Sequence, residues 1–120
     1  MTRPGSKAFG TLLRHARERA GKSQTDVARY LRVSGPFISD VELGKRAPLV
    51  RAKIHEVARF LDTKPDGLIV AASQWHGVFE LPYGGGRQRE EVAAMLSARW
   101  ERLTREQLTS IVAVLEGDEP

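Results

Sequence analysis

Residues 22–46 read KSQTDVARYLRVSGPFISDVELGKR, and the first eleven of them carry the signals of a short helix followed by a turn. Ser23 can cap the N–H groups of the first turn, with Asp26 in the place of the usual capping-box glutamate. The apolar residues that share one face at helical spacing are Val27, Ala28 and Leu31. The stretch therefore predicts a helix over residues 24–31.

A second short helix is predicted over residues 35–43. Ser34 is its cap, Pro36 falls in its first turn, where the missing N–H costs no hydrogen bond, and Gly44 can adopt the left-handed conformation that ends a helix. Its inward residues are Ile38 and Val41. Its outward residues are Gly35, Pro36, Ser39, Asp40 and Leu43. Two helices in this order, joined by a tight turn, form a helix-turn-helix.

The stretch resembles the Cro/CI-type (XRE-like) helix-turn-helix family of bacterial and phage DNA-binding regulators. The resemblance rests on the pattern Ser23-Gln24-x-x-x-Ala28 and then Val33-Ser34-x-x-x-Ile38-Ser39-x-Val41-Glu42-x-Gly44-Lys45-Arg46-x-Pro48. It covers about residues 7–71 and implies five helices and a double-stranded DNA partner. In this family an arginine of the first helix pairs with a glutamate near the end of the third, which implies a structural pair of Arg17 and Glu42.

The apolar pattern predicts three further helices in this domain, over residues 7–20, 49–61 and 65–75. Residues 1–6 show no period and include Arg3, so they are expected to be a flexible arm, either disordered or reaching along a DNA groove. The helix-turn-helix domain is accordingly expected to span residues 7–76.

The last part of the chain, residues 77–120, has a different pattern. Gly77 breaks the preceding helix, residues 78–81 form a short β-prone run, and residues 82–86 contain a proline and three glycines typical of a hinge. Two helices follow, over about residues 87–102 and from a capping box formed by Thr104 and Gln107. The predicted fold class is all-α: a five-helix Cro/CI-type domain plus a C-terminal module of a short strand and two helices.

Two arrangements of this C-terminal module stay open. It can form a dimerisation module, since family members read operators as dimers, or it can fold back on the first five helices. The expected strand would pair with its own copy across a two-fold axis. The expected dimerisation residues are Val78, Phe79, Leu81, Trp100, Leu108 and Ile111.

The charge and composition of the chain restrict the classes of function that it can have. Residues 1–71 hold fourteen Lys and Arg against seven Asp and Glu, whereas residues 72–120 hold five against eight, so the helix-turn-helix part is the cationic part. A basic surface of this kind suits a polyanion such as DNA, although it is also an ordinary solvated surface. The chain has no cysteine and no long apolar run, so we expect no thiolate metal site and no membrane span, and a cytoplasmic, nucleoid-associated protein.

No enzyme activity and no cofactor are predicted. The three histidines are far apart in sequence, and the glycine-rich stretch over residues 83–87 lacks the lysine and hydroxyl residue that end a phosphate-binding loop. We interpret this stretch as a hinge.

The resemblance implies which residues meet DNA. At base edges these are Gly35, Pro36 and Asp40, with Phe37 and Ser39 nearby. Asp40 can accept a hydrogen bond from the amine of cytosine, or it is a solvated carboxylate; Phe37 can touch a thymine methyl, or it belongs to the core. The residues expected at phosphates are Lys22, Gln24, Thr25, Ser34, Lys45 and Arg46, and Arg51 and Lys53 could extend their track.

Two binding functions follow. The first is a dimeric repressor that reads a palindromic operator in the major groove. The alternative is an antitoxin or adaptor, in which the helix-turn-helix anchors the protein to DNA while the C-terminal module binds another protein.

Overall fold

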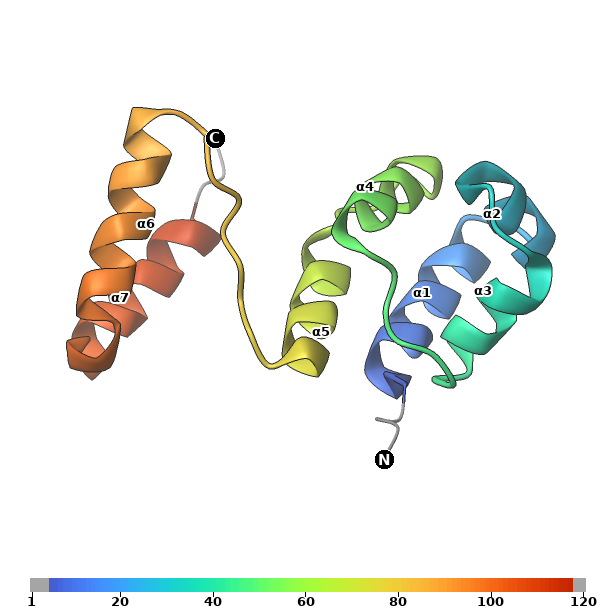
Figure 1. Ribbon diagram of the computed structural model, residues 1–120, viewed down its shortest axis with the longest axis horizontal. Coiled ribbons are helices and arrows are strands. Elements are labelled where there is room, and N and C mark those ends of the chain that lie inside the picture. The colour runs from blue at the N-terminus through green and yellow to red at the C-terminus, as the bar shows by residue number, and fades with distance from the viewer. Residues whose placement is uncertain (1–4, 118–120) are drawn as a thin grey trace. The chain divides into compact units, whose positions relative to one another are not determined.

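The computed structural model describes residues 5–117, and every regular element in that range is helical (Figure 1). The chain divides into two compact units between Glu80 and Leu81, which are described separately. The first unit contains α1 (Lys7–Arg19), α2 (Gln24–Leu31), α3 (Gly35–Glu42), α4 (Arg51–Phe60) and α5 (Asp66–His76). The second contains α6 (Arg87–Arg99), the 3-10 turn η1 (Trp100–Arg102) and α7 (Arg105–Glu116).

Local capping fixes the helix starts in the first unit. The side chains of Ser6, Ser23 and Ser34 accept hydrogen bonds from the first turns of α1, α2 and α3. Helix α2 has the predicted bounds, and α3 ends one residue earlier than expected. Helix α4 begins two residues later, because Leu49 is buried in the core and Val50 is extended.

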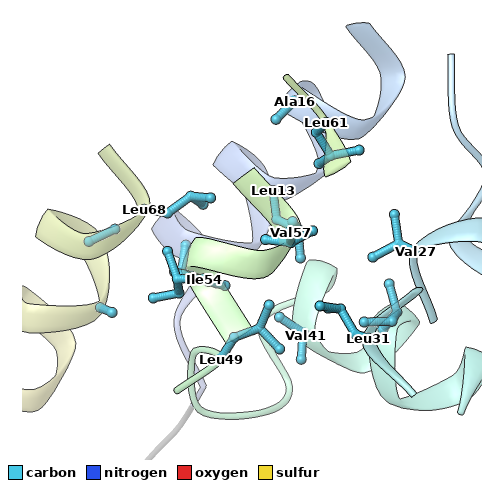
Figure 2. Close-up of a cluster of buried hydrophobic side chains, with 14 of the residues drawn as sticks. Leu13, Ala16, Val27, Leu31, Val41, Leu49, Ile54, Val57, Leu61 and Leu68 are labelled. Atoms are coloured by element: carbon cyan, nitrogen blue, oxygen red, sulfur yellow. The ribbon is translucent and has the colours of Figure 1, made fainter. Parts of the chain in front are cut away.

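The five helices enclose one hydrophobic core (Figure 2). Helix α1 packs on α3 and α5, α2 packs on α3 and α4, and α4 also contacts α5. The largest side chains that are almost wholly removed from solvent are Phe9, Leu13, Val27, Leu31, Ile38, Val41, Ile54 and Val57. Because α3 contributes only Ile38 and Val41 to this set, its opposite face is left for contacts outside the core.

Helices α1 and α3 approach each other closely at Gly10. A Cβ atom at this position would lie 2.4 Å from the backbone oxygen of Glu42 and 2.5 Å from that of Val41. The glycine thus has a packing reason in the middle of a helix, where it otherwise costs about 1 kcal/mol relative to alanine. This contact sets how deeply α3 sits against α1.

The predicted strand over residues 78–81 is wrong. No strand occurs in residues 5–117, and the segment after Gly77 is irregular, with the side chains of Val78, Phe79 and Leu81 exposed. The β propensity of the run is real, but a strand needs a paired backbone, and none of the described residues pairs with this segment as a strand. The all-α class holds, without the strand.

The second unit has no buried side chain among its described residues. Helix α6 runs into η1, and α7 begins at the predicted capping box, where the N–H of Gln107 donates to Thr104 Oγ1 (3.1 Å) and Gln107 Oε1 accepts from the N–H of Thr104 (3.0 Å). The side chains that are partly covered are Ala93, Leu96, Leu103 and Ile111. Two helices alone leave most of their apolar surface in water, which is a marginal arrangement for an isolated unit.

Candidate nucleic-acid interface

Helices α2 and α3 are joined by a turn that begins at Arg32. This residue has φ of 61° and ψ of 43°, a left-handed conformation that is uncommon for a residue other than glycine. The N–H of the following residue, Val33, donates to the backbone oxygen of Ala28 at 2.9 Å, and this hydrogen bond closes the end of α2. The turn therefore ends α2 at Leu31 and lets α3 begin after three connecting residues, at Gly35.

The N-terminus of α2 has a reciprocal capping box. The N–H of Asp26 donates to Ser23 Oγ at 3.0 Å, and the N–H of Ser23 donates to the carboxylate of Asp26 at 2.9 Å. Hydrogen bonds from the backbone and the hydroxyl of Ser23 lower the pKa of Asp26 below its ordinary value. The aspartate therefore replaces the more common glutamate in both geometry and charge.

A buried network holds α3 to α1 and α2. The Arg17 guanidinium donates to both carboxylate oxygens of Glu42, from Nε at 2.6 Å and from Nη2 at 3.0 Å. Gln24 Nε2 donates to Glu42 Oε1 at 3.0 Å, and Arg17 Nη1 donates to the backbone oxygen of Lys22 at 2.9 Å. Glu42, at the C-terminal end of α3, is thus bonded both to α1 and to the first residue of α2.

Gln24 is expected at a phosphate because it lies at a helix N-terminus, and the structure gives its side chain a further, structural contact. Its side-chain amide is a member of the Arg17–Glu42 network. Its backbone N–H still lies in the first turn of α2, where an α-helix leaves N–H groups without intrahelical partners. Any phosphate contact of Gln24 thus depends on its main chain.

The five residues expected at base edges all belong to α3. Gly35 and Pro36 form its first turn; Pro36 is exposed, and a side chain added at Gly35 would meet no atom within 4 Å. Ser39 is half-buried. Phe37 is also half-buried and packs against the core, as one of its two interpretations predicts, and its contact with a thymine methyl stays a prediction. The first turn of α3 therefore carries no long side chain at Gly35 and Pro36.

Asp40 and Phe37 are joined by the side chain of Arg46. Arg46 Nε lies 3.6 Å from Asp40 Oδ2, an ion pair longer than a hydrogen bond, and the guanidinium lies over the ring of Phe37 with 4.8 Å from Cζ to the ring centroid. About half of the Arg46 side chain (52%) and 38% of the Asp40 side chain are exposed. The structure thus brings a predicted phosphate contact onto the face of α3 that carries the predicted base contacts.

The other residues considered for phosphate contacts differ in their surroundings. Lys45 is exposed just beyond the end of α3, and Thr25 and Ser34 are exposed at the starts of α2 and α3. Lys22 lies with its ammonium 5.1 Å from the centroid of the Phe60 ring. Lys53 Nζ donates to the backbone oxygen of Leu31 at 2.7 Å, so this lysine satisfies the C-terminal end of α2. Among the residues expected at phosphates, Thr25, Ser34, Lys45 and Arg46 are exposed, whereas Lys22 and Gln24 are partly buried.

The residues expected at a dimer interface fall in both units. Val78 and Phe79 lie before the boundary, and Leu81, Trp100, Leu108 and Ile111 lie after it. All are exposed except Ile111, which is half-buried. Residues 1–4, including Arg3 of the expected arm, lie outside the described residues, whereas Ser6 is buried and caps α1.

Comparison with known proteins places this geometry in a family. A family model described as "Helix-turn-helix domain" matches residues 8–69, about half of the chain. The chain belongs to this helix-turn-helix family, and the Cro/CI-type resemblance of residues 22–48 is confirmed. It is accordingly a DNA-binding protein of the transcription-regulator class. No curated protein matches the chain.

Several solved structures are similar to part of the chain. The restriction-modification controller protein C.AhdI from Aeromonas hydrophila is 31% identical, with 52% of this chain and 92% of that chain covered and a TM-score of 0.47. The clp gene regulator ClgR from Corynebacterium glutamicum is 25% identical, with 80% and 92% covered and a TM-score of 0.48. Hydroxypropylphosphonic acid epoxidase from S. wedmorenis is 24% identical, but only 35% of that chain is covered; its TM-score is 0.49.

Two absences apply to the described residues. None of the helices within residues 5–117 has the length and apolar character that a membrane crossing requires. Nor does that range hold a group of three or more His, Asp or Glu side chains placed to bind a metal ion.

Three contacts were not predicted from the sequence. They are the close approach of α1 to α3 at Gly10, the hydrogen bond from Gln24 to Glu42, and the position of Arg46 over α3. Only the first left a signal, since a glycine that interrupts an amphipathic helix often marks a close backbone approach. The other two join residues on different elements, and no spacing in the sequence specifies them.

Proposed function

We propose that the chain is a sequence-specific regulator of transcription that inserts α3 into the major groove of double-stranded DNA. This proposal rests on one observation: one side of α3 is buried in the core, and the other side faces away from it. Ile38 and Val41 are buried in the core, while Gly35, Pro36 and Asp40 lie outside it. The major groove of B-DNA is wide enough to admit one α-helix, and a first turn of glycine and proline permits a close approach of the backbone to the base pairs.

In this complex, phosphates lie against the helix ends that border α3. The first N–H groups of α2, at Gln24 and Thr25, carry the partial positive charge of a helix N-terminus, which attracts an anion, and Ser34 lies at the start of α3. Lys22 and Lys45 add cations on either side. Base edges meet Pro36 and Phe37 through thymine methyl groups, and Ser39 and Asp40 through polar contacts, including acceptance from the amine of cytosine.

We further propose that the protein acts as a dimeric repressor on a palindromic operator. The dimer forms through residues 77–120, and the support is the apolar surface left open in the second unit. Trp100 and Leu108 are 60% and 43% exposed, and a second copy of the same helices is a partner of matching chemistry. Val78, Phe79 and Leu81 would add exposed apolar side chains near the start of this module.

Selection of duplexes from a random library by the purified full chain tests the DNA proposal. We expect one enriched motif with two-fold symmetry, whose half-sites are about 10 base pairs apart or a multiple of that distance. Solution mass in the absence of DNA should be that of a dimer. A library that stays random after repeated rounds at low salt contradicts sequence-specific binding, and enrichment of a single half-site by a monomer contradicts the dimer alone.

The second candidate function is that of an antitoxin or adaptor. It is favoured by the same exposed side chains of α6 and α7, because a partner protein could cover them in place of a second copy. A monomeric solution mass, together with preserved DNA binding, would favour this candidate over the dimeric repressor.

A further inference from the structure

We infer that Arg46 reads a guanine in the major groove, and that Asp40 and Phe37 hold its guanidinium in the orientation required. The inference rests on the proposed insertion of α3 into DNA and identifies which side chain supplies sequence specificity. It reassigns Arg46 from a phosphate contact to a base contact. It also reassigns Asp40 from the proposed contact with cytosine to a positioning residue that acts through Arg46.

The guanidinium lies along the exposed side of α3. Phe37 and Asp40 are three residues apart, so they lie on one strip of the helix, and Arg46 contacts both: its Cζ is 4.8 Å from the centroid of the Phe37 ring and its Nε is 3.6 Å from Asp40 Oδ2. The aromatic ring and the carboxylate thus contact the guanidinium at two points and restrict its position. The ion pair engages Nε, which leaves the two terminal nitrogens to donate.

The backbone of Arg46 is also fixed. Gly44, with φ of 74°, reverses the chain after α3, and the N–H of Lys45 donates to the backbone oxygen of Asp40 at 2.9 Å. The N–H of Ser6 donates to the backbone oxygen of Arg46 at 3.3 Å. A Cβ atom at Gly5 would lie 2.3 Å from that same oxygen, so Gly5 packs tightly against Arg46. The arginine therefore extends over α3 from an anchored position.

This arrangement adds a long side-chain hydrogen-bond donor, which the exposed face of α3 does not itself have. Guanine presents two acceptors, O6 and N7, in the major groove, and a planar fork of donors is the side chain that matches both. The face formed by Gly35, Pro36 and Ser39 has no long donor, and the carboxylate of Asp40 would be repelled by both acceptors. The positive charge of Arg46 offsets the negative charge of Asp40. The Asp40 carboxylate then holds the Arg46 guanidinium, which is the donor that can bind guanine.

A phosphate contact would not require these constraints. A cation that neutralises a phosphate needs charge and reach, and Lys45, exposed and adjacent in sequence, offers both. A guanidinium that lies over an aromatic ring and is ion-paired has less freedom, which is of use where a defined pair of acceptors must be met.

The test compares duplex selection by the full-length wild type with selection by Arg46→Lys, Asp40→Asn and Lys45→Ala. Arg46→Lys keeps the charge but loses the fork, so we expect it to lose one guanine per half-site, to bind the wild-type site about 5-fold to 150-fold more weakly, and to keep the salt slope. Asp40→Asn should weaken the preference for the same guanine. Lys45→Ala, the control, should select the wild-type motif with a smaller salt slope.

A substituted base gives a second readout that a change in folding cannot mimic. Replacing that guanine by 7-deazaguanine removes N7, which should weaken wild-type binding but leave Arg46→Lys binding unchanged. If Arg46→Lys selects the wild-type motif, Arg46 reads no base and this inference fails, while the proposed function stands. If Asp40→Asn alone changes the motif, and does so at a cytosine, Asp40 is itself the reader and the inference also fails. If the wild type selects no motif, the proposed function fails first.

Discussion

Arg17 and Glu42 form a two-pronged ion pair between the first and third helices, with Nε and Nη2 of the arginine 2.6 and 3.0 Å from the two carboxylate oxygens. Only 2% of the Glu42 side chain and 13% of the Arg17 side chain are exposed. The hydrogen bonds that Arg17 donates to Glu42 raise the pKa of the arginine above its ordinary value. The resemblance implied this pair, and the structure adds Gln24 as a third member.

We expect Glu42→Ala to destabilise the protein by about 3–5 kcal/mol, because it leaves the Arg17 guanidinium buried without its partner. The matched control is Glu18→Ala, which breaks the exposed Arg14–Glu18 pair (3.4 Å) and should cost no more than about 1 kcal/mol. Urea unfolding followed by circular dichroism measures both values. Equal midpoints for the two variants would show that the buried pair contributes nothing.

Gly10→Ala should destabilise the protein even though alanine forms helices better than glycine. Its Cβ would collide with the backbone of Val41 and Glu42, and forced repacking of this kind costs about 1–3 kcal/mol. Gly67→Ala is the control: it also lies in a helix, α5, but no atom lies within 4 Å of its new Cβ, so it should be neutral or stabilising by up to about 1 kcal/mol. Thermal melts of the two variants should shift in opposite directions, or differ clearly in size.

Asp26 should make the stability of the protein depend on acid pH. Its pKa is lowered in the folded state by the hydrogen bonds from Ser23, so its contribution is present above the unfolded-state pKa and is lost as the pH falls through the folded-state pKa. Asp26→Asn keeps an acceptor for the capping box but cannot titrate. The melting temperatures of the two proteins should therefore differ most near neutral pH and converge in acid; parallel curves would exclude Asp26 as a source of the pH dependence.

Lys45→Ala should weaken binding to every DNA sequence by a similar factor. Loss of one phosphate contact lowers the slope of log K against log salt by about one unit, without a change in the preferred motif. Lys64→Ala removes a charge outside the helices α2 and α3 and their connecting residues, and it serves as the control. Fluorescence anisotropy at several salt concentrations, with a selected and a random duplex, measures these slopes. An unchanged slope would remove Lys45 from the phosphate contacts.

Leu108→Glu and Ile111→Glu should each convert the proposed dimer to a monomer, because each places a charge among the apolar side chains of α7. Thr109→Glu adds the same charge to the same helix at a polar position and should leave the mass of the dimer unchanged. Light scattering across a range of protein concentrations gives the masses. A dimer that survives both apolar substitutions would place the interface elsewhere in the chain.

Sequence analysis was most successful where the determining interactions are local. Ser23, Ser34 and Thr104 were identified as caps, and each accepts the expected hydrogen bond, because a capping side chain bonds to backbone only three residues away. It failed for residues 78–81, where β-prone side chains predicted a strand that is not formed. The side-chain partners of Gln24 and Arg46 were also not predicted. Gln24 bonds to Glu42 on another helix, and Arg46 pairs with Asp40 across the turn after α3.

The sequence by itself determined the number, order and approximate bounds of the helices, the helix-turn-helix at residues 22–46 and its family, since capping and apolar periodicity act within one or two turns of the chain. Tertiary structure alone decided how closely α3 approaches α1 at Gly10, that Gln24 turns inward to Glu42, and that Arg46 lies across Phe37 and Asp40. These contacts join residues that become neighbours only when the core has formed, so their energies depend on positions that no local pattern encodes.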